Sequence, residues 1–254
     1  MWAVLFVKNC RGVFRKVRLG VSTSVIRSDL RFLGYFLKKF RSFDLFELGF
    51  LDPTFLNSIN NIKKPYGIHA PFIFKLSSHP KFTSGDFEET FRKILKSALF
   101  ARNLSAEYLI VHYPDTLQTK DWRSNFRLLE QLSNIIKVRV ENTFGNSFFY
   151  KASDYRFLCK ELNLGLCIDL GHLLIDDRLN PFEFIEQLAD FIEEFHVYYA
   201  NSKTYKTCHH MPWYEDKVYI DLLRLIKSFN VDIVIESTPE CNGIEKLIDF
   251  LGVR

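Results

Sequence analysis

The chain has 254 residues, of which 47% are hydrophobic, with a formal net charge of +4 and an isoelectric point near 8.7. This composition excludes an intrinsically disordered chain, and the length suffices for one large domain or two small ones. The mild basicity permits contact with phosphate but does not predict nucleic-acid binding, because a modest charge excess commonly serves solubility. No run of about 18 apolar residues occurs, so we expect no membrane-spanning helix.

The five cysteines are widely spaced, and none forms a Cys-x-x-Cys pair. We therefore expect no disulfide framework and a reducing, cytoplasmic location. Residues 1–16 begin with a short apolar stretch that lacks the basic start and the cleavage site of a signal peptide. We interpret them as an extra strand or arm in front of one domain that spans residues 17–254.

Eight short apolar runs are predicted to be strands. In chain order they are Val17–Thr23, Asp44–Phe50, Tyr66–Pro71, Glu107–Tyr113, Ile136–Asn142, Leu164–Leu170, Glu194–Ala200 and Val231–Ser237. Most lack strict alternation of apolar and polar residues, as expected of strands that are buried on both faces.

Helical periodicity separates these runs, most clearly over Phe87–Arg102 and in Pro181–Phe191, where a proline follows the capping residue Asn180. Eight alternations in about 250 residues predict a single (β/α)8 TIM barrel, an α/β fold with a parallel sheet. A doubly wound sheet is the alternative. It usually carries a glycine-rich loop after the first strand, and VSTSVIRS is not such a loop.

Strand periodicity gives the barrel interpretation a specific test. If Glu141 faces inward, then Arg139 and Lys137 should do so too, and an inward His196 places Glu194 inside as well. Alternate strands share layers inside such barrels. We therefore predict a buried ion pair between Arg139 and Glu194, because an unpaired buried charge would be costly.

Acidic residues and histidines lie at or just past the carboxyl ends of these runs. They are His69, His112, Glu141, Asp169, His172, His196 and Glu236. The carboxyl ends of parallel strands open on one face, so these side chains should converge there. Carboxylates and imidazoles are common metal ligands, and the pattern therefore predicts a metal centre.

Each of these residues also has an ordinary structural explanation. Glu141 and Glu236 end β-branched runs, where an unpaired carboxylate is destabilising, but either is compatible with a solvated strand end or an ion pair. Any single strand-end histidine is compatible with a core residue bonded to the backbone. The Asp-x-x-His spacing of Asp169 and His172 often occurs by chance. Gly171 between them would let the chain turn so that both side chains face one pocket.

Three further assignments stay open. Glu47, in DLFELGF, either lines the pocket or makes a structural pair. Lys203 is placed to hold an anionic substrate group, although a surface lysine is the default. His209 and His210 lie in a polar loop and are equally compatible with exposure to solvent.

Taken in order, the segments HAPF, VHYP, ENTFG, IDLGH, HVYYANSK, HHMPW and IEST resemble the xylose isomerase-like TIM barrels. That superfamily joins sugar and sugar-phosphate isomerases and epimerases with endonuclease IV, an apurinic/apyrimidinic endonuclease. The resemblance extends from about Val17 to the carboxyl terminus. Each segment is weak by itself, and their order and spacing carry the resemblance.

The isomerase and epimerase members imply one divalent cation (Mn²⁺, Mg²⁺, Co²⁺ or Zn²⁺) and a small carbohydrate substrate. The implied ligands are Glu141, Asp169, His196 and Glu236. Such a cation stabilises an enediolate, and by similarity Glu141 and Glu236 would remove and return the proton. His172 and His210 would hold substrate hydroxyls.

The endonuclease members imply zinc and a DNA substrate. The implied ligand sets are His69, His112 and Glu141; Glu141, Asp169, His196 and Glu236; and His172 with an Asp-x-His pair. In this chain Cys208 stands where that aspartate would precede His210, and cysteine also binds zinc.

The sequence favours the isomerase or epimerase interpretation, because its early strand-to-helix loops are short and poor in residues that would probe a DNA groove. The endonuclease is the alternative. A barrel that binds sugar or metal without turnover has little support, since the four-residue ligand set is complete. The sequence specifies neither the sugar nor the oligomeric state.

Overall fold

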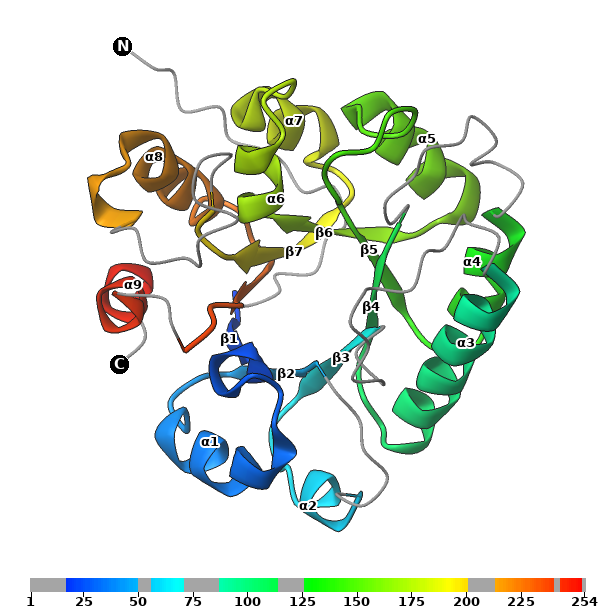
Figure 1. Cartoon of the computed structure of the whole chain (residues 1–254), viewed down its shortest axis with the longest axis vertical. Helices are drawn as coiled ribbons and strands as arrows, with labels where there is room; N and C mark the ends of the chain where they lie inside the picture. The colour runs from blue at the N-terminus through cyan, green and yellow to red at the C-terminus, as the bar shows by residue number, and fades with distance from the viewer. Residues whose placement is uncertain are drawn as a thin grey trace.

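The computed structural model describes residues 17–49, 56–70, 87–113, 126–200, 213–239 and 243–252. Eight parallel strands form a closed barrel in chain order, with helices around the outside (Figure 1). The strands are β1 (Leu19–Ser22), β2 (Leu45–Leu48), β3 (Tyr66–Ala70), β4 (Leu109–His112), β5 (Val138–Glu141), β6 (Gly165–Asp169), β7 (Ile192–Val197) and β8 (Asp232–Ile235). The predicted (β/α)8 barrel is confirmed. Seven of the predicted runs contain a strand, and the run Glu194–Ala200 overlaps β7, which begins two residues earlier, at Ile192. The division between an arm of residues 1–16 and the barrel domain stays a prediction, because those residues lie outside the described part of the chain.

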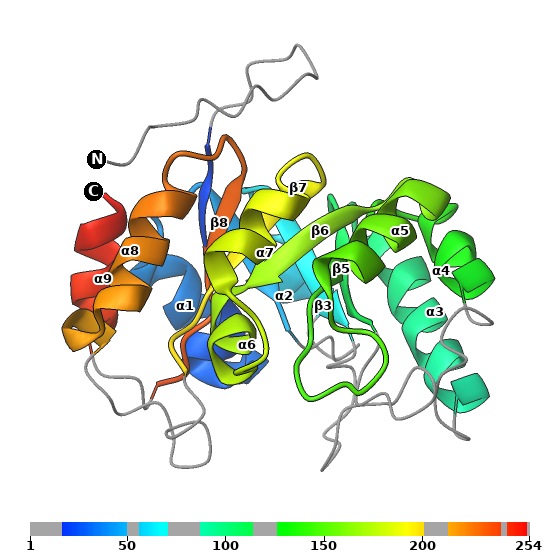
Figure 2. The ribbon, with the colours of Figure 1, turned by 90° about the horizontal axis from the view of Figure 1, so that it is seen from above.

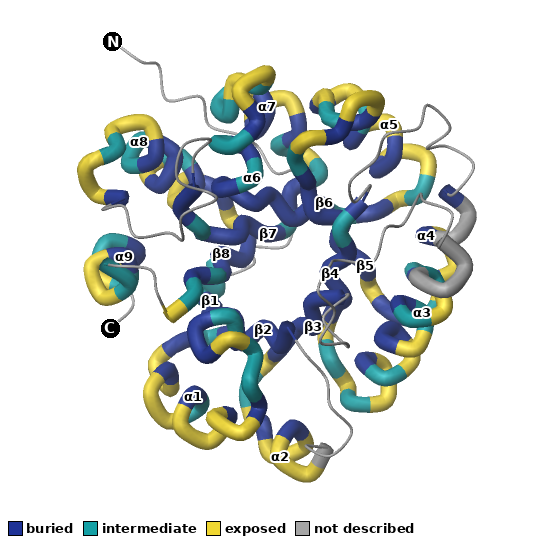
Figure 3. The backbone as a smooth tube through the Cα atoms, viewed as in Figure 1, coloured by how far each residue is buried: buried dark blue, intermediate teal, exposed yellow. Residues whose placement is uncertain are grey.

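The helices lie on the outer side of the strand ring. The α-helices of the described residues are α1 (Leu33–Lys39), α2 (Leu56–Asn60), α3 (Phe87–Asn103), α4 (Phe126–Ser133), α5 (Ala152–Leu162), α6 (Leu170–Ile175), α7 (Pro181–Leu188), α8 (Lys217–Ile226) and α9 (Ile244–Leu251). Short 3-10 helices are η1 (Thr23–Ile26), η2 (Leu30–Phe32) and η6 (Trp213–Glu215). The strands are buried and the outer faces of the helices are exposed (Figure 3).

Local sequence explains where several helices begin and which faces they bury. Helix α7 begins at Pro181 because the Asn180 side chain accepts hydrogen bonds from the N–H groups of Phe182 and Glu183, at 3.1 and 3.4 Å. Within α3, Ile94 and Ala98 are buried as the periodicity predicts. The next residue, Leu99, lies at the edge of this buried face and is 38% exposed.

Two separate apolar regions follow from the alternation of side chains along each strand. Outward-facing residues pack under the helices in one large core. Inside the barrel, the even-numbered strands contribute a second, smaller cluster. It consists of Leu45, Tyr108, Ile110, Cys167 and Val234. This inner layer separates the amino-terminal end of the barrel from the carboxyl-terminal end, where the candidate site lies.

The amino-terminal end of the barrel interior is ionic. Arg139 and Glu194 both point inward and form the predicted ion pair, and Arg139 Nη2 donates to Asp232 Oδ2 at 2.8 Å. The guanidinium carbon lies 3.7 Å from the centre of the Tyr108 ring. The expectation that Lys137 also lies inside is wrong. It precedes β5 at the open rim of the barrel, where its side chain is 46% exposed and pairs with Glu193.

A register shift brings two consecutive glutamates of β7 to this end of the barrel. Leu166 pairs with Ile192, but the next residue of β6 pairs with Glu194, so Glu193 is the extra residue. Its carboxylate occupies the space beside Gly165, where an added Cβ would lie 2.5 Å from Glu193 Cδ. The bulge therefore lets Glu193 reach Arg139 as well, at 3.2 Å.

Candidate metal centre

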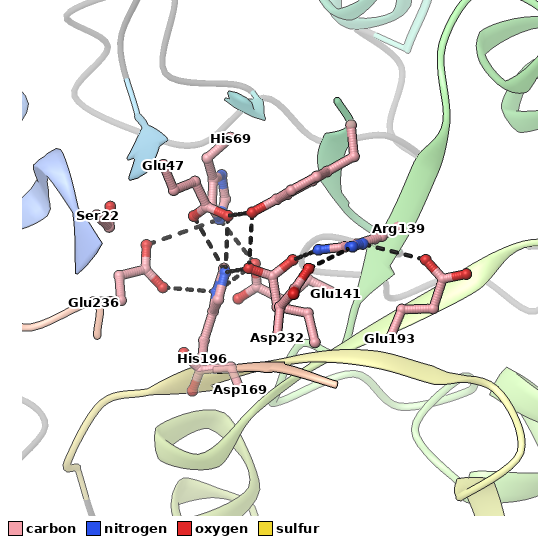
Figure 4. Close-up of polar contacts among 12 residues, drawn as sticks. Ser22, Glu47, His69, Arg139, Glu141, Asp169, Glu193, His196, Asp232 and Glu236 are labelled. Atoms are coloured by element: carbon pink, nitrogen blue, oxygen red, sulfur yellow. Dashed lines mark hydrogen bonds and ion pairs between the residues drawn. The ribbon is translucent and has the colours of Figure 1, made fainter. Parts of the chain in front are cut away.

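Polar side chains from the carboxyl ends of the strands meet inside the barrel (Figure 4). Glu141 ends β5, Asp169 ends β6, His196 lies in β7 and Glu236 directly follows β8. One ligand atom from each of these four residues lies within 4.8 Å of the others. The structure thus brings together the four residues that the resemblance to isomerases and epimerases implies as ligands of one cation, and their role as ligands stays a prediction.

A second group shares one member with the first. His69 Nε2 lies 2.8 Å and His112 Nε2 lies 3.1 Å from the same oxygen, Glu141 Oε2. The two imidazole rings meet edge to face with centroids 5.0 Å apart. Ligand atoms of His69, His112 and Glu141 lie within 4.8 Å of one another, so Glu141 belongs to both groups.

The ring of His69 is oriented by the backbone. Its Nδ1 lies 2.7 Å from the carbonyl oxygen of Ala70, which can only accept a hydrogen bond. Nδ1 therefore carries a proton, and Nε2 is the nitrogen directed at Glu141. This is the usual arrangement of a metal-binding histidine, whose second nitrogen donates to a carbonyl or carboxylate.

Asn142, which sequence reasoning missed, holds Asp169 in place. Its Oδ1 accepts from the Asp169 N–H at 2.7 Å, and its Nδ2 donates to the Asp169 carbonyl at 3.3 Å. The Asn142 carbonyl in turn accepts from His172 Nδ1 at 2.8 Å. The feature of the sequence that could have identified Asn142 is the polar triplet ENT (residues 141–143), which stands at the end of a buried strand. These hydrogen bonds connect the loop after β5 to the start of helix α6, and Figure 2 shows that the loop and the helix lie at the same end of the barrel.

Gly171 acts differently from the expectation. It has no left-handed backbone angle and lies inside α6, which Asp169 caps by accepting from the His172 N–H at 2.6 Å. An added Cβ at Gly171 would lie only 2.3 Å from the Tyr198 ring. The glycine is therefore needed for close packing rather than for a turn. His172 still faces the site, with Nδ1 3.3 Å from Glu141 Oε1.

The structure also settles the position of Glu47. Its side chain is fully buried inside the barrel and contacts His196, with Oε1 3.2 Å from Nε2. Three other candidates, Lys203, Cys208 and His210, lie outside the described residues, so their assignments stay predictions.

The charges of the site depend strongly on one another. Burial opposes ionisation of Glu141, but the imidazoles of His112, His196 and His69 outweigh it and hold the pKa of that carboxyl well below its usual range. Burial likewise opposes a charged His69, yet the nearby carboxylates, Glu141 first, raise its pKa to about 9. Burial dominates at Asp169 and raises its pKa to about 6.

These residues fit a divalent cation. His196 Nδ1 is buried and forms no hydrogen bond, although Glu236 Oε2 lies 2.9 Å and Glu141 Oε2 3.4 Å away. A lone pair directed at two carboxylates would be repelled, so the cluster requires either a proton or a cation between these atoms. Imidazole nitrogen and carboxylate oxygen are the donors that Zn²⁺ and similar cations take.

The sequence matches no family model and no curated protein sequence. Solved structures, however, share the arrangement of the barrel. A D-tagatose 3-epimerase-like protein matches with a TM-score of 0.68 and 21% identity over 92% of this chain and 97% of that chain. A xylose isomerase domain protein from Planctomyces limnophilus matches with a TM-score of 0.61 and 12% identity over 93% and 95%.

Endonuclease IV from Thermus thermophilus matches with a TM-score of 0.58 and 17% identity, over 86% of this chain and 91% of that chain. The chain has a xylose isomerase-like barrel fold. At these identities the likeness shows the fold alone, and it includes proteins named for different reactions.

Composition led to two further expectations, about membranes and about cysteines. Among the described residues, no helix has both the length and the apolar character needed to cross a membrane. Cys159 and Cys167, both in the described part, are buried and unpaired by disulfides. The cytoplasmic location stays a prediction.

Proposed function

We propose that this protein is a divalent-metal-dependent enzyme that hydrolyses phosphodiester bonds, with DNA containing abasic sites as the first substrate to test. One observation carries the proposal: Glu141 Oε2 is contacted by His69 and His112 while Glu141 also belongs to the four-residue group. A carboxylate shared in this way is suited to bridge two cations. This reverses the order of preference that the sequence suggested.

An isomerase that holds one cation in the four-residue group does not need these two histidines as metal ligands. His69 and His112 have side chains only 1% and 11% exposed, and both direct Nε2 at one carboxylate oxygen. A pair of cations supplies Lewis acidity toward both the attacking and the leaving oxygen of a displacement at phosphorus. Hydrolysis of a phosphodiester therefore uses all the ligands that the barrel presents, whereas isomerisation uses a part of them.

The chain's own residues would divide the work by position. Glu141 would bridge, His69 and His112 would complete one cation site, and Asp169, His196 and Glu236 would complete the other. His172 lies beside Glu141, with its side chain 14% exposed. Its Nδ1 is engaged by the Asn142 carbonyl, so Nε2 is the atom left to meet a substrate oxygen or a third cation.

A sugar or sugar-phosphate isomerase or epimerase is the second candidate. The observation in its favour is that Glu141, Asp169, His196 and Glu236 form a complete ligand set for one cation. In that reaction Glu141 and Glu236 would remove and return a proton on either side of a carbon of a small carbohydrate. Against it, the Glu141 side chain is 1% exposed and lies under histidines, while that of Glu236 is 17% exposed and reachable.

Metal content and two activity assays separate these candidates. We expect the purified protein to bind at least two zinc ions per chain and to nick duplex DNA at an abasic site. The His112→Ala variant should lose one ion and nicking activity while keeping the four-residue group intact. Asp221→Asn, on the surface of α8, serves as a control that should keep both.

Other outcomes would change the proposal. One bound cation together with exchange of solvent deuterium into a ketose, without nicking, would replace the phosphodiesterase with the isomerase. Binding of sugar without exchange would indicate a barrel without turnover. Absence of metal binding would reject the metal centre itself.

A further inference from the structure

A buried carboxylate lies directly behind one of the candidate ligands. Glu47, in β2, is fully buried inside the barrel. Its Oε2 lies 3.3 Å from His196 Nε2 within hydrogen-bond geometry, and its Oε1 lies 3.2 Å from the same nitrogen. Figure 4 shows the Glu47 carboxylate and the His196 ring facing each other, with Glu236 to the left of the ring.

The two nitrogens of His196 thus have separate surroundings. Nε2 faces Glu47, whereas Nδ1 faces Glu236 Oε2 at 2.9 Å and Glu141 Oε2 at 3.4 Å. A neutral imidazole carries one proton, and a carboxylate can only accept a hydrogen bond. With a cation between Nδ1 and those two carboxylates, the proton belongs on Nε2, where Glu47 accepts it.

We propose that Glu47 is a positioning residue that fixes the tautomer and the ring orientation of His196 and so presents Nδ1 to the metal centre. Carboxylates that accept from the second nitrogen of a metal-binding histidine orient the ring and raise its basicity. This inference rests on the metal centre of the proposed function but not on which reaction occurs there.

Glu47 is itself held from the amino-terminal end of the barrel. The Tyr108 hydroxyl lies 3.3 Å from Glu47 Oε2 and 3.1 Å from Glu194 Oε1, and Glu194 pairs with Arg139. A continuous chain of polar contacts therefore runs from the Arg139 ion pair through Tyr108 and Glu47 to His196. Because Tyr108 holds the Glu47 carboxylate in place, that carboxylate can hold the His196 imidazole in one orientation.

Metal affinity tests the proposal without using catalysis. In competition with a chelator, Glu47→Gln should bind Zn²⁺ about 10–100-fold more weakly than the wild type, as expected for the loss of such a carboxylate. The amide can turn its NH2 toward Nε2 and so favour a proton on Nδ1. Glu193→Gln is the matched control, since it removes a carboxylate that contacts Arg139 and Lys137 rather than His196, and it should change affinity little.

Thermal unfolding separates positioning from a general structural role. For Glu47→Gln, the melting temperature of the metal-free protein should stay near that of the wild type, while the increase on adding Zn²⁺ should shrink. If Glu47→Gln lowered the melting temperature by the same amount with and without zinc, and left the zinc affinity unchanged, the proposal would be wrong. A wild type that binds no zinc would reject the metal centre and this inference together, whereas equal affinities of wild type and Glu47→Gln reject only this inference.

The tautomer is observable directly. In the zinc-loaded protein with ¹⁵N-labelled histidine, His196 should show a protonated Nε2 and a metal-bound Nδ1. Coordination through Nε2, or direct ligation of zinc by Glu47, would contradict the proposal.

Discussion

Among single residues, the properties of the candidate metal centre depend on a few buried groups that shift one another's pKa values. Glu141 has a lowered pKa because histidines surround it, and His69 has a raised pKa because carboxylates surround it. Neither property is visible in the local sequence, where each residue only ends or nearly ends an apolar strand. They arise because β3 and β5 bring these side chains within 2.8 Å.

The raised pKa of His69 predicts that metal binding releases protons. With a pKa of about 9 in the metal-free protein, His69 is protonated at pH 7, and a cation at Glu141 must displace that proton. Zinc affinity should therefore increase as the pH rises from about 6.5 toward about 9. Calorimetry at pH 7 should give binding enthalpies that vary with the ionisation enthalpy of the buffer. His69→Ala should reduce the number of protons released, and an enthalpy identical in all buffers would contradict the assignment.

At the scale of elements, the strands carry the information that the sequence expresses best. Their burial on both faces made them recognisable, and the alternation along β5 and β7 correctly placed Arg139 and Glu194 inside the barrel. The alternation gave the wrong position for Lys137, because this residue precedes β5 and its side chain lies at the exposed rim of the barrel. It also gave no sign of the bulge at Glu193, which depends on how β6 and β7 pair.

Strand β3 offers a test of how tightly the inner layers fit. A Cβ added at Gly67 would lie 2.2 Å from the Tyr108 ring, and Tyr108 is anchored by Glu47 and Glu194. We expect Gly67→Ala to destabilise the protein by about 1–3 kcal/mol, because an enclosed ring cannot move aside freely. The measurement is the midpoint and slope of urea unfolding.

Helix α1 supplies the control for that substitution. Gly34 has nothing within 4 Å of an added Cβ, so Gly34→Ala should not destabilise the protein and should gain up to about 1 kcal/mol from the helical preference of alanine. If both substitutions had the same effect, the packing argument for Gly67 would be wrong.

At the scale of the whole molecule, the barrel interior has an ionic end, a thin apolar layer and a site rich in carboxylates and histidines. Ion pairs at this end connect strands that are distant in the sequence. Arg139 of β5 contacts Glu194 of β7 and Asp232 of β8. Arg18, just before β1, also contacts Asp232, at 2.8 Å. Such a buried network demands that every charge keep its partner.

Removal of Arg139 should therefore be severe. Arg139→Met leaves Glu194 without its cation inside the barrel, and we expect a loss of about 3–5 kcal/mol in the free energy of unfolding. Urea unfolding at pH 7 measures it. The exposed ion pair of Arg224 and Asp221 provides the comparison, and Arg224→Met should leave the unfolding midpoint almost unchanged. Similar losses for both variants would show that the buried network has no special importance.

The barrel, the approximate positions of its strands and the polar residues at their carboxyl ends are predictable from sequence alone, because apolar runs and side-chain alternation are local properties. Three contacts are visible only once the chain is folded: His69 and His112 meet one oxygen of Glu141, Glu47 faces His196, and Asn142 holds Asp169. These contacts join strands far apart in the chain. They depend on the stagger of the closed barrel and on side-chain rotamers, which no local pattern records.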